Sequence, residues 1–248
     1  MIHFPCFFNK NKLRVLMYHK VTANGAVDYL TITLAQLEEQ INYLLKQDYS
    51  VISIHQLIGY VSKQLPLPAK PVLLTFDDGY HNNLTILYPL LQKFNICATI
   101  FLIGQNTLHS TDNNTEREYL DVKDIASMDK SIVSFGLHSY MHGSYATLNP
   151  EQVAMDIDYC MIHFNKLGID VQPCLAYPYG AFPKRNIKKR KNLEEILRRK
   201  NIQLAFRIGN RLNVLPLKNS YLIERIDVRG IESFSKFKRK LHYGSKWW

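Results

Sequence analysis

Residues 72–80 read Val-Leu-Leu-Thr-Phe-Asp-Asp-Gly-Tyr, and the rest of the chain is organised around this stretch. Its first four residues, 72–75, are apolar or β-branched, which is typical of a strand buried on both faces in a parallel sheet. The strand ends at two adjacent carboxylates, Asp77 and Asp78, and Gly79 permits a sharp turn behind them. Two readings follow: the acids cap the next helix, or they form part of a site at the end of a rigid element.

Strand and helix patterns alternate on both sides of this stretch. Thr33 and Ser53 each begin a capping box that opens a helix, and Asn149 with Pro150 opens another. Strands are expected near residues 13–18, 51–53, 72–75, 97–103, 131–135, 174–177, 203–207 and 221–227. Helices are expected between them, ending near residues 63, 94, 129, 167, 200 and 242. This repeated alternation predicts one parallel α/β domain that spans residues 1–248 and ends in a basic helix.

The composition fits a packed globular protein, because 46% of the 248 residues are hydrophobic. The four cysteines are widely scattered, so small core residues are expected rather than a disulfide framework or a zinc motif; they are Cys6, Cys97, Cys160 and Cys174. No stretch approaches the length of a membrane span, and residues 1–8 are too short for a signal-peptide core. A cytoplasmic or membrane-peripheral protein is therefore expected.

The formal net charge is +10, and much of it lies within residues 184–200. A solvated helix face is the favoured interpretation, with Glu194–Arg198 and Glu195–Arg199 as ion pairs one helical turn apart. Peripheral contact with an anionic membrane or polymer is the alternative. No nucleic-acid partner is expected, because no aromatic platform is interleaved with the charges.

Polar or turn residues follow the predicted strands at their C-terminal ends. They are His19, the Asp77–Asp78 pair, His138, Pro178-Tyr179-Gly180, Arg207 and Asp227. In a parallel barrel or a doubly wound sheet these ends meet on one face, which carries the active site. The shared position favours a functional role for the two acids over simple helix capping.

The segment His138-Ser-Tyr-Met-His142 places two histidines four residues apart. Either one face of a helical turn or a tight loop lets both imidazole rings reach one ion. With one carboxylate, they form a two-histidine, one-carboxylate site that leaves positions open for water and substrate.

Three segments in this order make the sequence similar to a known family: Thr75-Phe-Asp-Asp-Gly79, His138-Ser-Tyr-Met-His142 and Tyr177-Pro-Tyr-Gly180. They resemble the polysaccharide deacetylases of carbohydrate esterase family 4, which contain the NodB-homology domain. The resemblance covers roughly residues 13–230. It implies a distorted (β/α)7 barrel with parallel strands and outer helices. It also implies removal of N-acetyl groups from an N-acetylated glycan, with release of acetate. No particular oligomeric state is implied.

The resemblance also assigns roles to residues. Asp77 would be the general base, and Asp78, His138 and His142 would hold one divalent metal ion. Zinc is the first choice of ion, with iron, cobalt or nickel as alternatives. Tyr179 would supply a backbone N–H to the oxyanion.

The general acid has two candidates. Most of the family carries it in a C-terminal leucine-x-histidine motif, and the C-terminal candidate here is His242, in Leu241-His-Tyr243. The segment Val15-Leu-Met-Tyr-His19 instead resembles a circularly permuted branch that includes the poly-N-acetylglucosamine deacetylases. His19 is preferred because it terminates a strand, whereas His242 is expected on an exposed basic tail.

The chain departs from the family where an arginine usually orients the base. It has Leu175-Ala-Tyr177 at that point, and no aspartate-tryptophan motif is evident. Arg225 or Arg207 is expected to place a guanidinium beside Asp77 instead.

Aromatic residues near the motifs are expected to stack on sugar faces, and core packing is the alternative for each. The candidates are Tyr140, Tyr177 and Phe182. Two other functions remain as alternatives. A non-haem iron oxygenase would use the same ligands but leaves Asp77 and His19 without a purpose. A basic, catalytically weak or inactive glycan-binding module would explain the missing arginine.

Overall fold

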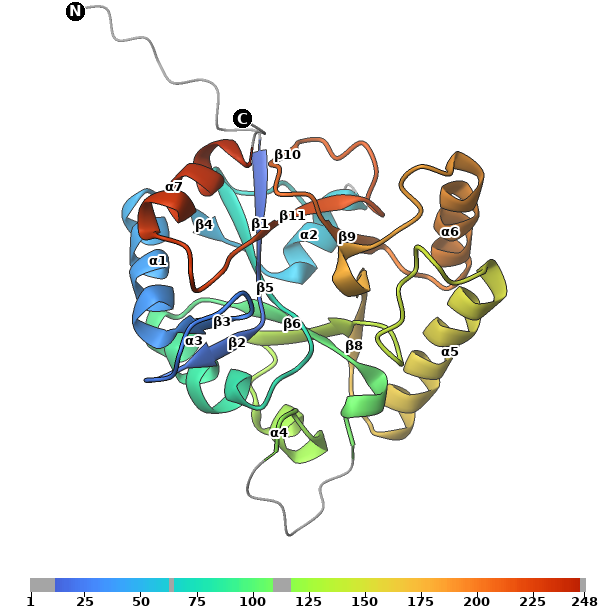
Figure 1. Cartoon of the computed structure of the whole chain (residues 1–248), viewed down its shortest axis with the longest axis horizontal. Helices are drawn as coiled ribbons and strands as arrows, with labels where there is room; N and C mark the ends of the chain where they lie inside the picture. Colours follow the sequence, from blue (N-terminus) through green and yellow to red (C-terminus); the bar gives the residue numbers. More distant parts are fainter. Residues whose placement is uncertain (1–11, 63–64, 109–116, 246–248) are drawn as a thin grey trace, which may run out of the picture.

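The computed structural model describes residues 12–62, 65–108 and 117–245. Within these residues, seven parallel strands close into a barrel, because β1 pairs with both β5 and β11 (Figure 1). In ring order the strands are β1 (Lys12–Tyr18), β5 (Pro71–Phe76), β6 (Ala98–Leu102), β7 (Val133–Leu137), β8 (Val171–Ala176), β9 (Leu204–Ile208) and β11 (Ile223–Asp227). The predicted (β/α)7 barrel is confirmed.

Helices surround the ring (Figure 1). They are α1 (Leu34–Lys46), α2 (Ile54–Val61), α3 (Tyr88–Phe94), α4 (Val122–Ser127), α5 (Pro150–Lys166), α6 (Ile187–Arg199) and α7 (Phe234–Tyr243). The predicted capping boxes at Thr33 and Ser53 are present, and Asn149 caps α5 with Pro150 in its first turn. These caps satisfy backbone N–H groups that a helix leaves unpaired at its start.

Three short strands were not predicted, because two or three residues carry no hydrophobic period: β2 (Lys20–Thr22), β3 (Thr31–Thr33) and β10 (Asn213–Val214). The helix predicted to end near residue 94 starts as a π-helical turn (Asn83–Leu87) and continues as α3. The strand expected at 51–53 is reduced to β4 (Ser50–Val51), which pairs with β5 outside the ring. The strand expected at 131–135 begins two residues later as β7. The Asp129 carboxylate accepts from the Ser131 N–H and holds residues 129–132 in a turn.

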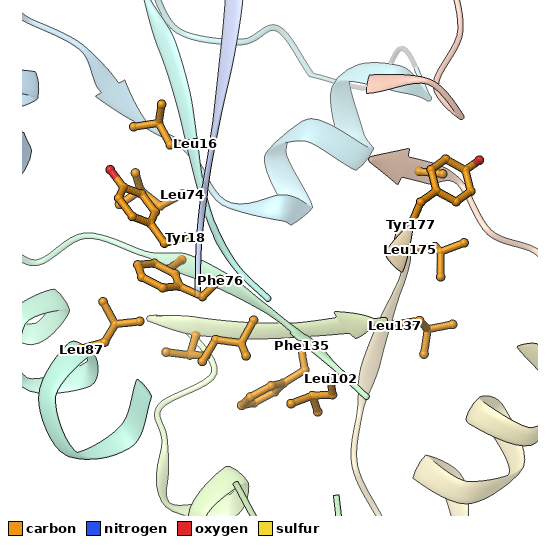
Figure 2. Close-up of a cluster of buried hydrophobic side chains, with 14 of the residues drawn as sticks. Leu16, Tyr18, Leu74, Phe76, Leu87, Leu102, Phe135, Leu137, Leu175 and Tyr177 are labelled. Carbon is orange, nitrogen blue, oxygen red and sulfur yellow. The ribbon is translucent and has the colours of Figure 1, made fainter. Parts of the chain in front are cut away.

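Alternate side chains of each barrel strand pack on opposite sides of the wall. Inside the ring lie residues such as Val15, Leu73, Phe101 and Cys174. Outside it, a larger layer packs under the helices; Figure 2 shows part of it, with Leu16, Tyr18, Leu74, Phe76, Leu87, Leu102, Phe135, Leu137, Leu175 and Tyr177 labelled. Because strands are buried on both sides, they read as continuous apolar runs.

Gly136 illustrates how full the interior is. A Cβ atom at this position would lie 2.7 Å from both Cys174 Sγ and the Phe101 ring. Cys160 and Cys174 are buried and unpaired, as predicted, and Cys97 is half-buried. Cys6 and the rest of residues 1–8 lie outside the described residues.

The basic helix α6 keeps some of its charge in ion pairs along its own surface. Glu195 contacts Arg199 at 3.7 Å, as predicted, and Arg190 lies 4.0 Å from Glu194. Arg198 pairs with Glu195 rather than with the predicted Glu194. Among the helices that the structure describes, none combines the length and apolar character needed to cross a membrane.

Candidate active site

The two acids that follow β5, Asp77 and Asp78, differ in backbone conformation. The Asp77 N–H donates to the Tyr18 carbonyl at 2.9 Å, so Asp77 still extends the strand pairing. Asp78 and Gly79 then adopt left-handed backbone angles, with φ of 74° and 73°. This turn is sterically costly for an aspartate but natural for glycine. The neighbouring carboxylates therefore occupy different environments.

Asp78 meets both predicted histidines. Its Oδ1 atom lies 3.3 Å from His138 Nε2 and 3.4 Å from His142 Nε2, and the two Nε2 atoms are 3.2 Å apart. The histidines follow β7 in a loop, not on one face of a helix. One potential ligand atom from each of the three residues lies within 4.8 Å of the others.

The hydrogen bonds around this cluster fit a cation. His138 Nδ1 lies 2.8 Å from the Ala176 carbonyl, which can only accept, so Nδ1 carries the proton and Nε2 presents its lone pair. Asp78 Oδ1 is buried and lacks a hydrogen-bond partner among the described residues. A buried acceptor facing two imidazole nitrogens is costly without a positive charge between them. Two nitrogens and one carboxylate oxygen are a ligand set that a divalent transition metal accepts.

Asp77 is held by Arg225 from β11. The guanidinium donates from Nη1 to Oδ1 at 2.6 Å and from Nη2 to Oδ2 at 2.7 Å, and the arginine is fully buried. Burial alone would raise the pKa of Asp77, but the charges of Arg225 and His138 outweigh it and hold that pKa below its usual value. Arg207 does not take this place, since it pairs with Glu224 and lies over the Phe182 ring.

His19 and His242 lie at different ends of the barrel. His19 follows β1 at the same end as the acids, and its Nδ1 atom is buried without a hydrogen-bond partner among the described residues. Burial lowers the pKa of His19, while the carboxylates of Asp77 and Asp78 act to raise it. His242 instead lies between Tyr43 and Tyr49, beside the start of β1.

The expectation that His242 lies on an exposed tail is wrong. It is half-buried, with its Nε2 atom 2.9 Å from the Tyr43 hydroxyl and its Nδ1 atom 3.4 Å from the Tyr49 hydroxyl. Arg14, early in β1, donates to the carbonyl of Leu241 at 3.1 Å and fixes α7 there. α7 is amphipathic, and His242 lies partly on its buried side although the basic composition of the segment predicted exposure.

Tyr179 lies in a short 3₁₀ turn, Pro178–Gly180, with a left-handed φ of 59°. Backbone N–H groups in such a first turn have no partner within the turn. Its side chain is 66% exposed, and its hydroxyl lies 3.1 Å from His142 Nδ1. Tyr179 therefore touches the histidine cluster from the end of β8.

Of the three predicted sugar-stacking residues, two are core residues. Tyr177 is fully buried and donates its hydroxyl to the Tyr221 carbonyl at 3.0 Å. Phe182 is buried against the Tyr177 ring. The prediction that these two stack on sugar is wrong, because the motif places them next to the site but behind its surface. Tyr140 is half-buried and packs on Tyr159.

Sequence reasoning missed Asp156, a buried acid of α5 that contacts the histidine loop. The available signal was a charged residue on the face of α5 that otherwise buries Val153, Ile157 and Cys160. A charge on the apolar side of a helix is unusual unless it has a partner in the fold.

Comparison with known proteins gives a consistent result. The family model described as polysaccharide deacetylase matches residues 64–195, more than half of the chain. YxkH of Bacillus subtilis (strain 168), which is named for the same family, is 25% identical over 177 residues, which are 71% of this chain and 60% of that protein. The chain thus spans less than two thirds of the length of this relative.

A second curated relative is the poly-beta-1,6-N-acetyl-D-glucosamine N-deacetylase of Staphylococcus aureus. It is 21% identical over 239 residues, covering 88% of this chain and 79% of the relative. Among solved structures, the deacetylase PplD of Streptococcus pyogenes, in complex with acetate, superposes with a TM-score of 0.75 at 20% identity. That match covers 94% of this chain and 99% of the other, and it shows a shared fold.

Proposed function

The chain belongs to the polysaccharide deacetylase family, and from this premise we propose that it is a metal-dependent carbohydrate N-deacetylase. The reaction would hydrolyse N-acetyl groups of an N-acetylated amino-sugar polysaccharide or glycoconjugate and release acetate. The observation that carries the proposal is the convergence of Asp78, His138 and His142 beside an acid, Asp77, that a buried arginine orients.

We assign Asp78, His138 and His142 as ligands of one divalent cation. Zinc suits two imidazoles and a carboxylate with further positions open, and iron, cobalt or nickel would suit the same donors. When bound, such an ion would polarise the acetyl carbonyl and lower the pKa of a water molecule.

Asp77 is proposed as the general base that accepts the proton of the attacking water. Arg225 keeps this carboxylate ionised and fixes both of its oxygens, so it presents a defined lone pair to the site. Because its pKa is lowered despite burial, Asp77 is ionised at neutral pH, which is the state that a general base requires.

Two further groups complete the proposed reaction. The backbone N–H of Tyr179 would donate to the oxyanion that forms as water adds to the carbonyl. Protonated His19, at the end of β1, would give its proton to the departing amine. Burial lowers the pKa of His19, which makes its protonated form a stronger acid, and the carboxylates of Asp77 and Asp78 offset only part of that shift.

The relatives guide the choice of glycan. The Staphylococcus aureus relative is named for poly-beta-1,6-N-acetyl-D-glucosamine, which makes N-acetylglucosamine polymers the first substrates to test. Tyr140, in the loop between the two histidines, remains the candidate that stacks on a sugar face.

We treat residues 1–248 as one catalytic domain and propose that α6 gives it a peripheral contact with an anionic polymer or membrane. The ion pairs of α6 lie at Arg190 and in its C-terminal half, whereas Lys188 and Lys189 are exposed and have no ion pair among the described residues. Cations at a helix N-terminus oppose the helix dipole, so they are available to an external anion.

One experiment tests the function. The metal content of the purified protein is measured, and acetate release is followed from neutral and anionic N-acetylated glycans with added zinc or cobalt. The proposal expects about one equivalent of a divalent ion and metal-dependent release of acetate. A higher rate on anionic glycans that falls with salt would support the role of α6. Glycan binding with neither bound metal nor acetate would favour the inactive binding module instead.

The structure weakens the case for that module. Its support was the absent motif arginine, and the contact of Arg225 with Asp77 supports a substitute from β11. The oxygenase alternative shares the ligands but gives no purpose to the Asp77–Arg225 pair.

A further inference from the structure

The loop that carries the two candidate ligands has a demanding backbone. Ser139 and His142 both adopt left-handed angles, with φ of 67° and 56°, and neither is glycine. A Cβ atom crowds the backbone in this region, so such residues persist only where their surroundings hold them. The direction of both imidazole rings depends on this conformation.

Asp156, from the middle of α5, contacts the loop directly. Its Oδ1 atom accepts from Ser139 Oγ at 3.1 Å and from the Tyr140 N–H at 3.1 Å. Its Oδ2 atom accepts from the Tyr145 hydroxyl at 2.6 Å and shares the Tyr140 N–H at 3.2 Å. One carboxylate thus binds the two residues that follow His138.

Other contacts fix the remaining groups of the loop. Ser139 Oγ, while donating to Asp156, accepts from the Gly143 N–H at 3.1 Å, which closes the turn around His142. On its opposite edge the loop carbonyls are held by the segment after β6. There the Gly104 N–H donates to the Ser139 carbonyl at 3.1 Å, and the Gln105 N–H donates to the Tyr140 carbonyl at 2.9 Å.

Asp156 has no other visible purpose. It is 8% exposed and forms no ion pair with a lysine, arginine or histidine among the described residues. Its neighbours on the same face of α5 are apolar, and an apolar residue would be easier to bury there. Within the part of the chain that the structure describes, all of its side-chain hydrogen bonds end on residues 139–145.

We propose that Asp156 is a positioning residue of the metal centre. Through Ser139 Oγ and the Tyr140 N–H it holds the 138–142 loop so that the Nε2 atoms of both histidines face Asp78. The inference rests on the proposed function, because the ion is the one assigned there. Its test is therefore a metal-binding measurement made without substrate.

The experiment compares wild type with Asp156→Asn and Ser139→Ala. Asp156→Asn keeps the size of the side chain but replaces one of its two accepting oxygens with an amide N–H₂, which donates instead. Ser139→Ala leaves Asp156 in place and removes the hydroxyl that links it to the loop. The control is Asp158→Asn, two residues along α5, where the carboxylate pairs with Lys200 at 2.6 Å outside the site.

Three quantities are measured: zinc affinity by competition with a chromophoric chelator, the absorption spectrum of the cobalt form, and the melting temperature of the metal-free protein. Both test variants are expected to bind zinc about 10–100-fold more weakly and to shift the cobalt spectrum, as loss of an outer partner of a metal ligand does. Asp158→Asn is expected to match wild type in both readouts.

Wild-type zinc affinity in both test variants, with only a lower melting temperature, would make Asp156 a structural residue and overturn the inference. If Asp156→Asn does not fold, Ser139→Ala decides alone, because it removes the Ser139 Oγ contact with Asp156 and leaves α5 and the Tyr140 N–H contact unchanged. A wild-type protein that binds zinc but releases no acetate would contradict the proposed function. The zinc affinities of the two variants relative to wild type would still decide the present inference.

Discussion

Two arginine–carboxylate pairs lie back to back across the barrel wall at β11. Arg225 faces the interior and binds Asp77 through both nitrogens of its guanidinium, fully shielded from solvent. Its neighbour Glu224 faces outward and pairs with Arg207 of β9, where both side chains keep some exposure. The chemistry is the same, and the strand alternation sends one pair to each side.

The difference shows what makes an ion pair useful at a site. On the outside, the side chains of Arg207 and Glu224 are 13% and 17% exposed, so solvent screens their charges more than those of the fully buried pair. On the inside, the arginine shifts the pKa of Asp77 downward and fixes its orientation next to the histidine cluster. An acid that must accept a proton at neutral pH needs the second environment.

Replacing the arginine of each pair should give the largest difference, which is expected in the free energy of unfolding. Arg225→Met leaves a buried carboxylate without its partner, which costs about 3–5 kcal/mol of unfolding free energy. Arg207→Met is the comparison variant and should cost less, because the Arg207–Glu224 pair keeps some contact with solvent. Denaturant unfolding of both variants checks this. Equal costs would mean that the two pairs share one electrostatic environment.

Replacing the acid of each pair, Asp77 or Glu224, tests the comparison through the rate of acetate release. Asp77→Asn should retain zinc and lower the rate of acetate release about 10²–10⁴-fold, the range of a lost general base. Glu224→Gln removes a carboxylate from the outer pair and should leave the rate unchanged. Metal content and initial rates are measured together. Zinc loss in Asp77→Asn would show that both acids bind the ion and would end the proposed division of roles.

The two candidates for the general acid, His19 and His242, give a similar comparison between a residue at the proposed site and one at the other end of the barrel. His19→Ala should lower turnover about 10²-fold with metal intact, because water still protonates the amine slowly. His242→Ala loses only its contacts with Tyr43 and Tyr49 and should keep wild-type turnover. The opposite ranking in a kinetic assay would move the acid role to α7.

Much of the fold could be predicted because the central strands are buried on both sides and therefore read as unbroken apolar runs. The stretch around Asp77 is the strongest case, and its strand extends the prediction by one residue at each end. The metal candidates were recognisable because a motif keeps them close in sequence or at a strand end. Short strands such as β2 and β10 have no period to detect.

The remaining errors share one physical cause, which is that sequence patterns do not report which side of the wall a residue takes. Arg207 and Arg225 both lie within predicted strands, and only the alternation along each strand of the closed barrel sends Arg225 inward and Arg207 outward. Tyr177 and Phe182 lie near a motif yet pack behind it. Asp156 joins the site from a distant helix, so no local spacing links it to His138.

β1 closes the ring between β5 and β11, and this has a consequence for synthesis of the chain. Until β11 has left the ribosome, β1 has a free edge on one side and Asp77 has no guanidinium to hold it. The arginine that binds the proposed base is thus among the last parts of the barrel to be translated. A chain that stops early carries every metal candidate but lacks the guanidinium beside Asp77, so we expect hydrolysis only from the completed ring.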